Sequence, residues 1–371
     1  MKTLFCYVGS MVESYKPYIA MLLVQFVYAG MALFSKAAVA KGMNPFVFVV
    51  YRQAFASFAL APFAFFLESK KTSPLSYYLL CKIFLISLFG LTLSLNLYYV
   101  AINYTTATFA AATTNTIPAI TFVMAGLLRM ESVSIKHVYG IAKVLGSITG
   151  VSGALVFAFV KGPPLKFMNW YHPNSQKQIA DTSINACSLE DWIKGALIML
   201  AANTAWSLWL ILQGQIIKEY PAKIRLTSLQ CFFSCIQSCF WAVAAERNPS
   251  AWKLGWDTHL LSIVYCGVIV TGITYWVQVW AIEKRGPVFT AIFTPFALII
   301  TAIFSVFLWK ETLYWGSVGG AVLLVCGLYG VLWGKNKEEE KVKSVRNDEE
   351  NPVDDQIKEG NILECITHHT G

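Results

Sequence analysis

Ten apolar runs, each about as long as a bilayer is thick, constrain the fold of this chain more than any other feature. A helix that crosses the hydrocarbon core needs about 20 mainly apolar residues. The runs cover residues 17–35, 45–67, 83–102, 105–128, 138–160, 195–217, 226–245, 260–282, 287–309 and 312–333. Backbone polar groups in lipid must be satisfied internally, which favours helices. The sequence therefore predicts an all-α polytopic membrane protein with ten transmembrane helices.

The composition agrees with a lipid environment and narrows the classes of function. Of the 371 residues, 56% are hydrophobic and only 13% are charged, whereas soluble domains carry about 25% charged residues. This deficit argues against a disordered chain, a disulfide scaffold and a nucleic-acid-binding module. The sequence has no Gly-rich phosphate loop and no Cys/His metal spacing. We expect no cofactor, no metal, no nucleic-acid partner and no enzymatic activity.

Lysine and arginine are unevenly distributed between alternate loops. With a cytosolic N-terminus, 19 loop and tail cations fall on the cytosolic side and eight fall outside. Cytosolic loops carry the excess of positive charge in membrane proteins, so we expect both termini in the cytosol. The expected regions are a cytosolic N-terminus (1–16), a first five-helix half (17–160), an extracytosolic linker (161–191), a second five-helix half (192–333) and a disordered acidic cytosolic tail (334–371).

An internal repeat relates the two predicted halves. A shift of 180 residues aligns Phe109 with Phe289, Glu131 with Glu311, Gly140 with Gly320 and Gly150 with Gly330. Spans four and five therefore recur as spans nine and ten. Because each half has an odd number of helices, the two halves enter the membrane from opposite sides. Inverted repeats of this kind are typical of transporters that work by alternating access.

Neutral polar and aromatic side chains lie along single faces of several predicted spans. The candidate substrate-binding residues on these faces are Asn96 in span three, Trp206 in span six, and Tyr275 and Gln278 in span eight. Interhelical hydrogen bonding is the alternative role, and it is common in membrane bundles. For any single Asn or Gln the two roles stay open. Several such faces in corresponding halves favour a shared polar cavity.

Two prolines predict interrupted helices at related places. Pro118 lies inside span four and Pro295 inside span nine, and the repeat relates these spans. Proline frees the carbonyl of the preceding turn, and freed backbone within a membrane is tolerated where it lines a cavity. Asn115 and Thr294 add a polar side chain to each break. We interpret the breaks as part of the transport site, with simple helix kinks as the alternative.

Two cations lie inside the predicted spans. Lys36 is near the outer end of span one and can extend its ammonium group to the interface. Arg52 is about 10 Å from the outer end of span two by helical rise. An arginine at that depth needs an anion, carbonyl groups or water. It either attracts a substrate carboxylate or holds neighbouring helices together, and the sequence slightly favours the second role.

Several segments closely resemble plant EamA-type transporters of the drug/metabolite transporter superfamily, the nodulin-21-like, walls-are-thin-related group called UMAMIT. They read YRQ at 51–53, APFAFFLE at 61–68, NTIPAITF at 115–122, AIEKRGPVF at 281–289 and WKE at 309–311. The resemblance covers about residues 15–335 in order. It implies ten helices in two inverted repeats and bidirectional movement of amino acids, mostly as export.

The resemblance also defines the functional alternatives. Some relatives move auxin or related indoles, so the same fold could carry auxin or another small aromatic or organic acid. The expected location is the plasma membrane, with the vacuolar membrane as the alternative. A membrane scaffold or receptor that uses the acidic tail is a third, less favoured hypothesis. The expected partners are a small-molecule substrate and the lipid bilayer.

Overall fold

The structure is a computed structural model of the whole chain. It describes residues 15–31, 34, 43–68, 76–104, 113–128, 130, 137–160, 163, 189–255, 258–309, 315–316, 318–338 and 340–341, and the statements below concern these residues.

Every regular element in the described part of the chain is a helix. The first is the stretch 15–31, and the last is Val318–Glu338. Between them lie α2 (Pro45–Glu68), α3 (Tyr77–Ile86), η1 (Ser87–Thr92), α4 (Leu93–Tyr104), α6 (Ile117–Leu127), α7 (Val138–Phe159), α9 (Leu189–Glu219), α10 (Lys223–Ala245), η2 (Pro249–Trp252), α11 (Thr258–Val264), η3 (Tyr265–Ile273), α12 (Thr274–Arg285), α13 (Pro287–Ile292) and α14 (Thr294–Trp309).

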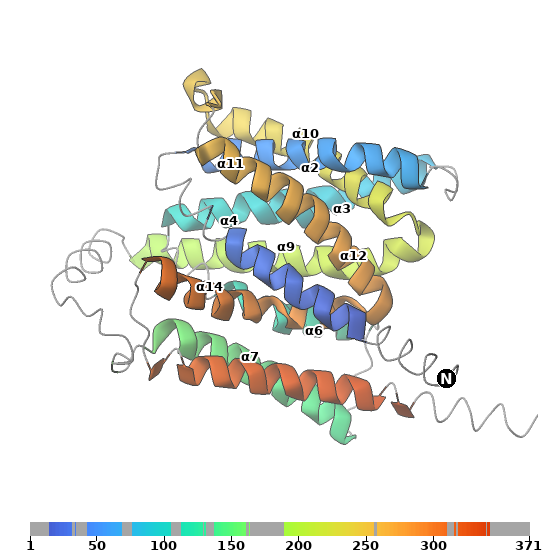
Figure 1. The fold of residues 1–371 in the computed structure, drawn as a ribbon, viewed down its shortest axis with the longest axis vertical. Helices are drawn as coiled ribbons and strands as arrows, with labels where there is room; N and C mark the ends of the chain where they lie inside the picture. The colour runs from blue at the N-terminus through green and yellow to red at the C-terminus, as the bar shows by residue number, and fades with distance from the viewer. Residues whose placement is uncertain are drawn as a thin grey trace, which may run out of the picture.

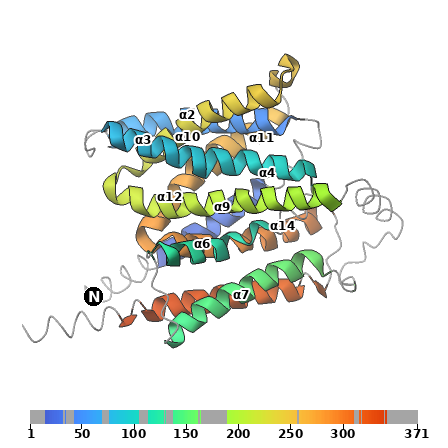
Figure 2. The same ribbon diagram turned by 180° about the vertical axis from the view of Figure 1, so that it is seen from behind.

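The predicted ten-helix membrane fold is confirmed. Seven helices among the described residues are long and apolar enough to cross a membrane. Two shorter apolar helices, Ile117–Leu127 and Pro287–Thr301, and the stretch 15–31 supply the other three. The helices run side by side along one direction, as Figures 1 and 2 show. The two ends of this bundle thus correspond to the two membrane surfaces.

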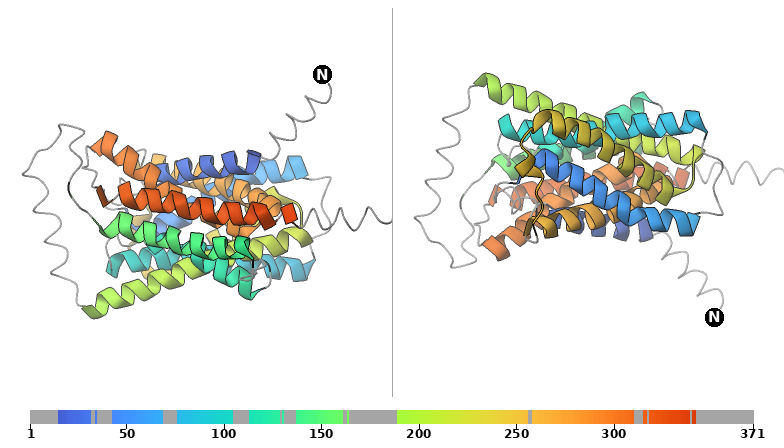
Figure 3. Two further views of the ribbon diagram at one scale, coloured as in Figure 1. Left: turned by 90° about the horizontal axis from the view of Figure 1, so that it is seen from below. Right: turned by 90° about the horizontal axis from the view of Figure 1, so that it is seen from above.

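The helices differ in how deeply they lie within the bundle. Both α9 and the helix that runs from α11 through α12 are more buried than α7. Figure 1 and the view from below in Figure 3 place α7 and the last helix together at one edge, although about 180 residues separate them in sequence. The protein interior therefore centres on α9 and α12, which carry three of the candidate substrate-binding residues, Trp206, Tyr275 and Gln278.

In the structure, spans four and nine are both interrupted close to the prolines Pro118 and Pro295. A turn at residues 115–116 precedes α6, whose second residue is Pro118. In the other half, a turn at Phe293 separates α13 from α14, whose second residue is Pro295. The related spans three and eight each contain a π-helical segment, η1 and η3. A shift of 180 residues moves η1 onto 267–272, within η3. The repeat thus appears in helix geometry as well as in sequence.

Two boundaries differ from the prediction. Helix α9 begins at Leu189, inside the segment expected to be linker. The last helix continues to Glu338, past the expected start of the tail at residue 334. A salt bridge between Lys143 and Glu338 fixes this extension against α7. Hydropathy does not detect either extension, because charged residues within each one lower its mean hydropathy below that of the adjacent apolar run.

Candidate functional site

The interior of the bundle holds many polar side chains but few charges. Among the described residues, Arg52 and Lys143 are the buried cations, and no Asp, Glu or His is buried. Lys143 pairs with Glu338 near one end of the bundle. Arg52 differs, because no carboxylate in the described part of the chain pairs with it, although it is only 4% exposed. An arginine stays protonated under these conditions, so the site carries a net positive charge.

Neutral oxygens hold the Arg52 guanidinium in place. Its Nε donates to the Thr271 hydroxyl at 2.6 Å, and one terminal nitrogen donates to the Tyr275 hydroxyl at 3.2 Å. Guanidinium has five N–H donors in a planar fork. The two bonds use part of this capacity and leave further donors for an incoming acceptor. Arg52 is therefore both fixed in orientation and incompletely neutralised.

The π-helical segment η3 explains how Thr271 reaches Arg52. In such a segment backbone carbonyls are displaced from their usual partners, and these segments are frequent at functional sites. The Thr271 hydroxyl donates to the Cys266 carbonyl at 2.9 Å, five residues earlier. Its proton is thereby engaged, and its oxygen is left as an acceptor for Arg52. Thr274 makes the same kind of bond to Ile269 at 3.0 Å.

Three aromatic rings lie next to this guanidinium site. Trp206 and Trp209 of α9 are 5.0 Å apart between ring centroids, and they lie 5.5 and 5.3 Å from Tyr275. We call these three residues the aromatic cluster. Tyr275 joins both sets, because its ring belongs to the cluster and its hydroxyl accepts from Arg52. Aromatic faces attract cations and pack against apolar groups.

One turn of α12 beyond Tyr275, a second polar group has unused hydrogen-bonding capacity. Gln278 is 4% exposed and its Oε1 has no hydrogen-bond partner. The Tyr28 hydroxyl, from the stretch 15–31, lies next to Gln278 and also interacts electrostatically with Arg52 and Tyr275. Like the Gln278 Oε1, the Tyr28 hydroxyl is buried and makes no hydrogen bond of normal geometry. Sequence reasoning missed Tyr28, because a lone tyrosine in an apolar run carries no periodic signal.

Asn96 belongs to a different set of contacts. Its Nδ2 donates to the Thr92 carbonyl at 2.8 Å and to the Ser238 hydroxyl of α10 at 3.4 Å. The Thr92 hydroxyl of η1 in turn donates to the Gln237 Oε1 of α10 at 2.8 Å and accepts from the Ser234 hydroxyl at 3.0 Å. These bonds join α4 to α10, which is the interhelical role that the sequence left open for Asn96.

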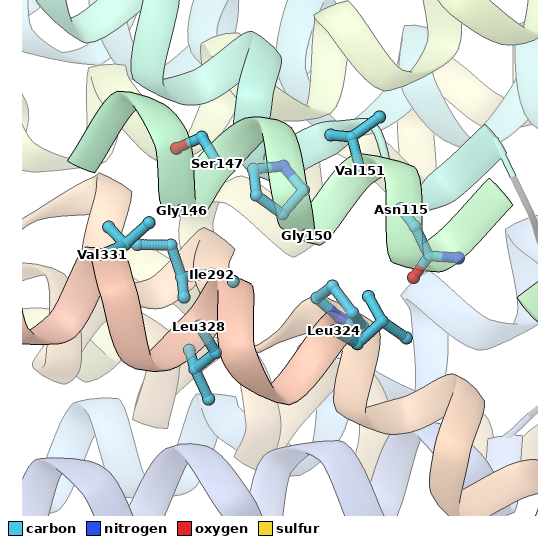
Figure 4. Close-up of a pocket in the computed structure, with 12 residues that line it drawn as sticks. Asn115, Gly146, Ser147, Gly150, Val151, Ile292, Leu324, Leu328 and Val331 are labelled. Atoms are coloured by element: carbon cyan, nitrogen blue, oxygen red, sulfur yellow. The ribbon is translucent and has the colours of Figure 1, made fainter. Parts of the chain in front are cut away.

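The residues at the helix breaks surround a small cavity between α7 and the last helix. Asn115, Pro118 and Pro295 line it together with Ser147 and small or aliphatic residues (Figure 4). Its volume is about 20 Å³, which is room for one water molecule. Thr294 is half-buried and does not line the cavity. The breaks from the two halves therefore meet, but in this conformation they do not enclose a substrate.

Span six stabilises the first of these breaks. The Asn203 side chain of α9 donates to the Thr113 carbonyl at 2.7 Å, and the Ser207 hydroxyl donates to the Ile117 carbonyl at 3.4 Å. Carbonyls that a regular helix would bind internally are thus bound by a neighbouring helix.

Two other cations, Lys36 and Lys143, lie in the predicted spans or at their ends. Lys36 lies outside the described residues. Lys143 lies within span five but close to its cytosolic end, and it is one of the 19 cations assigned to the cytosolic side. In the structure its side chain is buried and paired with Glu338. Hydropathy could not predict the pair, because the two residues are 195 positions apart.

Comparisons with known proteins identify relatives along almost the whole chain. A model described as the EamA-like transporter family matches residues 15–153 and 193–333. WAT1-related protein At1g43650 of Arabidopsis thaliana is 64% identical over 330 residues, covering 89% of this chain and 94% of the relative. WAT1-related protein At5g64700 of the same plant is 48% identical, covering 88% and 92%. One crystal structure superimposes with a TM-score of 0.63 at 15% identity, covering 85% of this chain and 96% of its own, and shares the fold.

Proposed function

We propose that this chain, which belongs to the EamA-like transporter family and is a membrane transporter, carries amino acids by alternating access. The two inverted five-helix halves exchange conformations around a central site. Net movement follows the substrate gradient, so the protein is a bidirectional facilitator that exports amino acids from loaded cells. The plasma membrane is the proposed location.

Arg52 is the observation that carries this proposal. A buried guanidinium that has unused donors and no acid partner among the described residues attracts a carboxylate, because the pair forms charge-assisted hydrogen bonds where water is scarce. The substrate carboxylate would accept from the guanidinium donors that Thr271 and Tyr275 leave unused. The aromatic cluster beside it offers faces for the amino group and for an apolar side chain. Amino acids combine these three chemical features.

The paired helix interruptions support movement by alternating access. Interrupted helices at corresponding positions of two halves are the usual location of transport sites. Here the breaks at Pro118 and Pro295 face the same small cavity. In this conformation the cavity admits only one water molecule. The proposal therefore requires that α7 and the last helix separate during the transport cycle.

A small aromatic carboxylic acid such as an auxin is the second candidate, with the vacuolar membrane as an alternative location. The observation that favours it is the lack of a buried Asp or Glu near the site among the described residues. An ammonium group would find no counter-ion there, whereas a monoanion would neutralise Arg52. The aromatic cluster suits an indole ring equally well.

Efflux from oocytes tests the proposal and separates the candidates. Cells that express the protein are loaded with a panel of labelled amino acids and, separately, with a labelled indole carboxylate. Export of one or more amino acids above uninjected cells supports the first candidate. Export of the indole carboxylate alone supports the second. If neither class moves while the protein reaches the surface, both substrate assignments are wrong.

Variants of Arg52 connect the flux to the carboxylate. We expect Arg52→Gln to lower transport at least tenfold, as expected for loss of a charge-assisted hydrogen bond. Arg52→Lys should restore only part of the flux, because an ammonium lacks the planar fork. Lys194→Gln changes an exposed cation and serves as the control. Undiminished flux in Arg52→Gln at normal surface abundance would contradict carboxylate binding by Arg52.

A further inference from the structure

The buried oxygens near Tyr28 define a polar region in which hydrogen-bonding capacity is left unused. The unpartnered atoms are the hydroxyl of Tyr28 and the Oε1 of Gln278. Gln25, one helical turn before Tyr28, adds a third such oxygen and is 1% exposed. Leaving a buried polar atom without a hydrogen bond costs about 1–3 kcal/mol. Such groups therefore indicate a ligand that supplies the missing partners.

We propose that Tyr28 and Gln278 form the subsite for the amino group of the substrate, next to the carboxylate site at Arg52. This inference rests on the proposed function and specifies its substrate as a zwitterion. An ammonium group has three donors and no acceptor. The unpartnered oxygens of the subsite have lone pairs that accept, and the Tyr28 hydroxyl proton has Gln278 beside it as an acceptor. The chemistry of the substrate thus complements the chemistry of the subsite.

The carboxylate site and the proposed subsite follow one another along the helix formed by η3 and α12. Thr271 at the end of η3 is followed by Tyr275 and Gln278 of α12, at intervals of four and three residues, which places the three side chains on one face. Thr271 and Tyr275 fix the guanidinium, and Gln278 follows one turn later. The Tyr28 hydroxyl interacts with both ends of this row, with Arg52 and Tyr275 on one side and Gln278 on the other. A substrate whose carboxylate meets Arg52 therefore brings its amino group to Tyr28 and Gln278.

The subsite also explains how an ammonium is accommodated without a buried acid. Neutral oxygens and the faces of Trp206 and Tyr275 share its charge. The substrate is neutral overall, so the positive charge of the site does not increase when it binds. A side chain with its own charge would add an unpaired ion. We therefore infer that amino acids with uncharged side chains are preferred.

Two compounds that differ by one amino group test the proposal. Phenylalanine and 3-phenylpropanoate share a ring, a chain and a carboxylate. The measurement is the concentration of each compound that halves uptake of a labelled amino acid which the protein carries. In the wild type we expect phenylalanine to inhibit at a concentration about tenfold or more below that of 3-phenylpropanoate. This ratio reports recognition of the amino group and is independent of how much protein reaches the surface.

The variants Gln278→Leu and Tyr28→Phe should reduce this ratio toward one, by weakening inhibition by phenylalanine and leaving that by 3-phenylpropanoate unchanged. Gln278→Glu should retain or increase the ratio, because a carboxylate binds ammonium well. The control Gln237→Leu makes the same change in α10, where Gln237 bonds Phe84 and Thr92. Tyr265→Phe removes the hydroxyl that bonds Val27. Both controls should leave the ratio unchanged.

Three results would overturn the subsite. The first is that Gln278→Leu and Tyr28→Phe change the inhibitory concentrations of both compounds by the same factor, and the second is that neither concentration changes. The third is a wild-type ratio of one. Failure of the broader proposal looks different, because no amino acid is then carried or Arg52→Gln has no effect. In a carrier of aromatic acids, 3-phenylpropanoate would inhibit better than phenylalanine.

Discussion

Asn115 and Thr294 accompany the two helix breaks, but the structure places them differently. Asn115 is buried and lines the cavity between α7 and the last helix, whereas Thr294 is half-buried outside it. Both side chains nevertheless stand on the N-terminal side of the proline of their break, Asn115 three residues before Pro118 and Thr294 directly before Pro295. Their shared role in the substrate path stays a prediction, and direct substitution tests it.

We expect Asn115→Ala to lower flux severalfold while surface abundance stays normal, because the cavity loses its polar side chain at a site that must open. Thr294→Ala should act in the same direction from the other half, and more weakly, because its side chain lies outside the cavity. Labelled amino-acid efflux, normalised to surface biotinylation, measures both effects. A parallel loss of protein and flux would instead assign these residues to folding.

At the scale of elements, glycines bring α7 and the last helix into backbone contact. A Cβ added to Gly327 would lie 2.4 Å from the Gly150 nitrogen and 2.7 Å from the Gly146 carbonyl oxygen. A Cβ on Gly320 would lie 2.3 Å from the Phe157 nitrogen. Small residues at helix crossings allow this approach in membranes.

Gly327→Ala should therefore destabilise the protein by about 1–3 kcal/mol, as overpacking does in a close-packed interior. The added methyl group meets backbone atoms, which cannot rotate away. Gly319→Ala is the matched control on the same helix, because a Cβ there has no atom within 4 Å. Thermal unfolding of purified protein in detergent should show a lower midpoint for Gly327→Ala alone. Equal midpoints for the two variants would contradict the packing seen here.

The π-helical segments η1 and η3 are a second feature at this scale. Each carries a threonine whose hydroxyl turns inward, Thr92 toward α10 and Thr271 toward Arg52. The two halves use this equivalent irregularity for different purposes. In the first half it joins helices, and in the second half it orients the cation of the candidate site. The same backbone geometry in η1 and η3 thus supports different side-chain contacts in the two halves.

The distribution of charge over the whole molecule bears on energy coupling. A proton relay through a membrane normally uses Asp, Glu or His at depth. In the described residues none of these is buried. Salt bridges such as Lys82–Glu219 and Lys223–Glu283 lie at one end of the bundle. The binding groups in the interior are neutral oxygens, aromatic rings and an arginine, and none of them titrates near neutrality.

We therefore expect transport that is not obligatorily driven by protons. Efflux and uptake should change little between about pH 5.5 and 7.5, the range in which histidine titrates, and an uncoupler should leave them unaffected. Reversing the substrate gradient should reverse net movement. Uphill accumulation that collapses with an uncoupler would contradict this expectation. It would implicate Glu131 or Glu311, which lie outside the described residues, or His259.

The topology is a second prediction for the whole molecule. Because 19 of the 27 loop and tail cations fall on one side, tags at residues 1 and 371 should both be cytosolic, and a tag near Asn174 should be external. Antibody access to tagged intact and permeabilised cells measures this. Protection of the Asn174 tag in intact cells, with both terminal tags exposed, would reverse the orientation.

The sequence alone determined the features that depend on local order. Runs of about 20 apolar residues predict membrane helices because lipid solvates the whole helix surface, and the ten-helix fold is confirmed. Proline breaks at Pro118 and Pro295 were likewise predictable, because proline removes a backbone donor wherever it stands. The repeat followed from residue spacing. These properties need no knowledge of which helices meet.

Only the tertiary structure decided which polar side chains share a site. Asn96, Tyr275 and Gln278 looked equivalent along their helices, yet Asn96 bonds α10 while Tyr275 bonds Arg52. Tyr28 lies at the candidate site although no sequence pattern indicates it. Lys143 pairs with Glu338, which is 195 residues away in the sequence. The apolar pattern within a membrane distinguishes helix from loop but hardly distinguishes the inner from the outer face, because lipid and protein interior are similarly apolar. Helix rotation, and with it the site, therefore depends on glycine contacts and long-range hydrogen bonds.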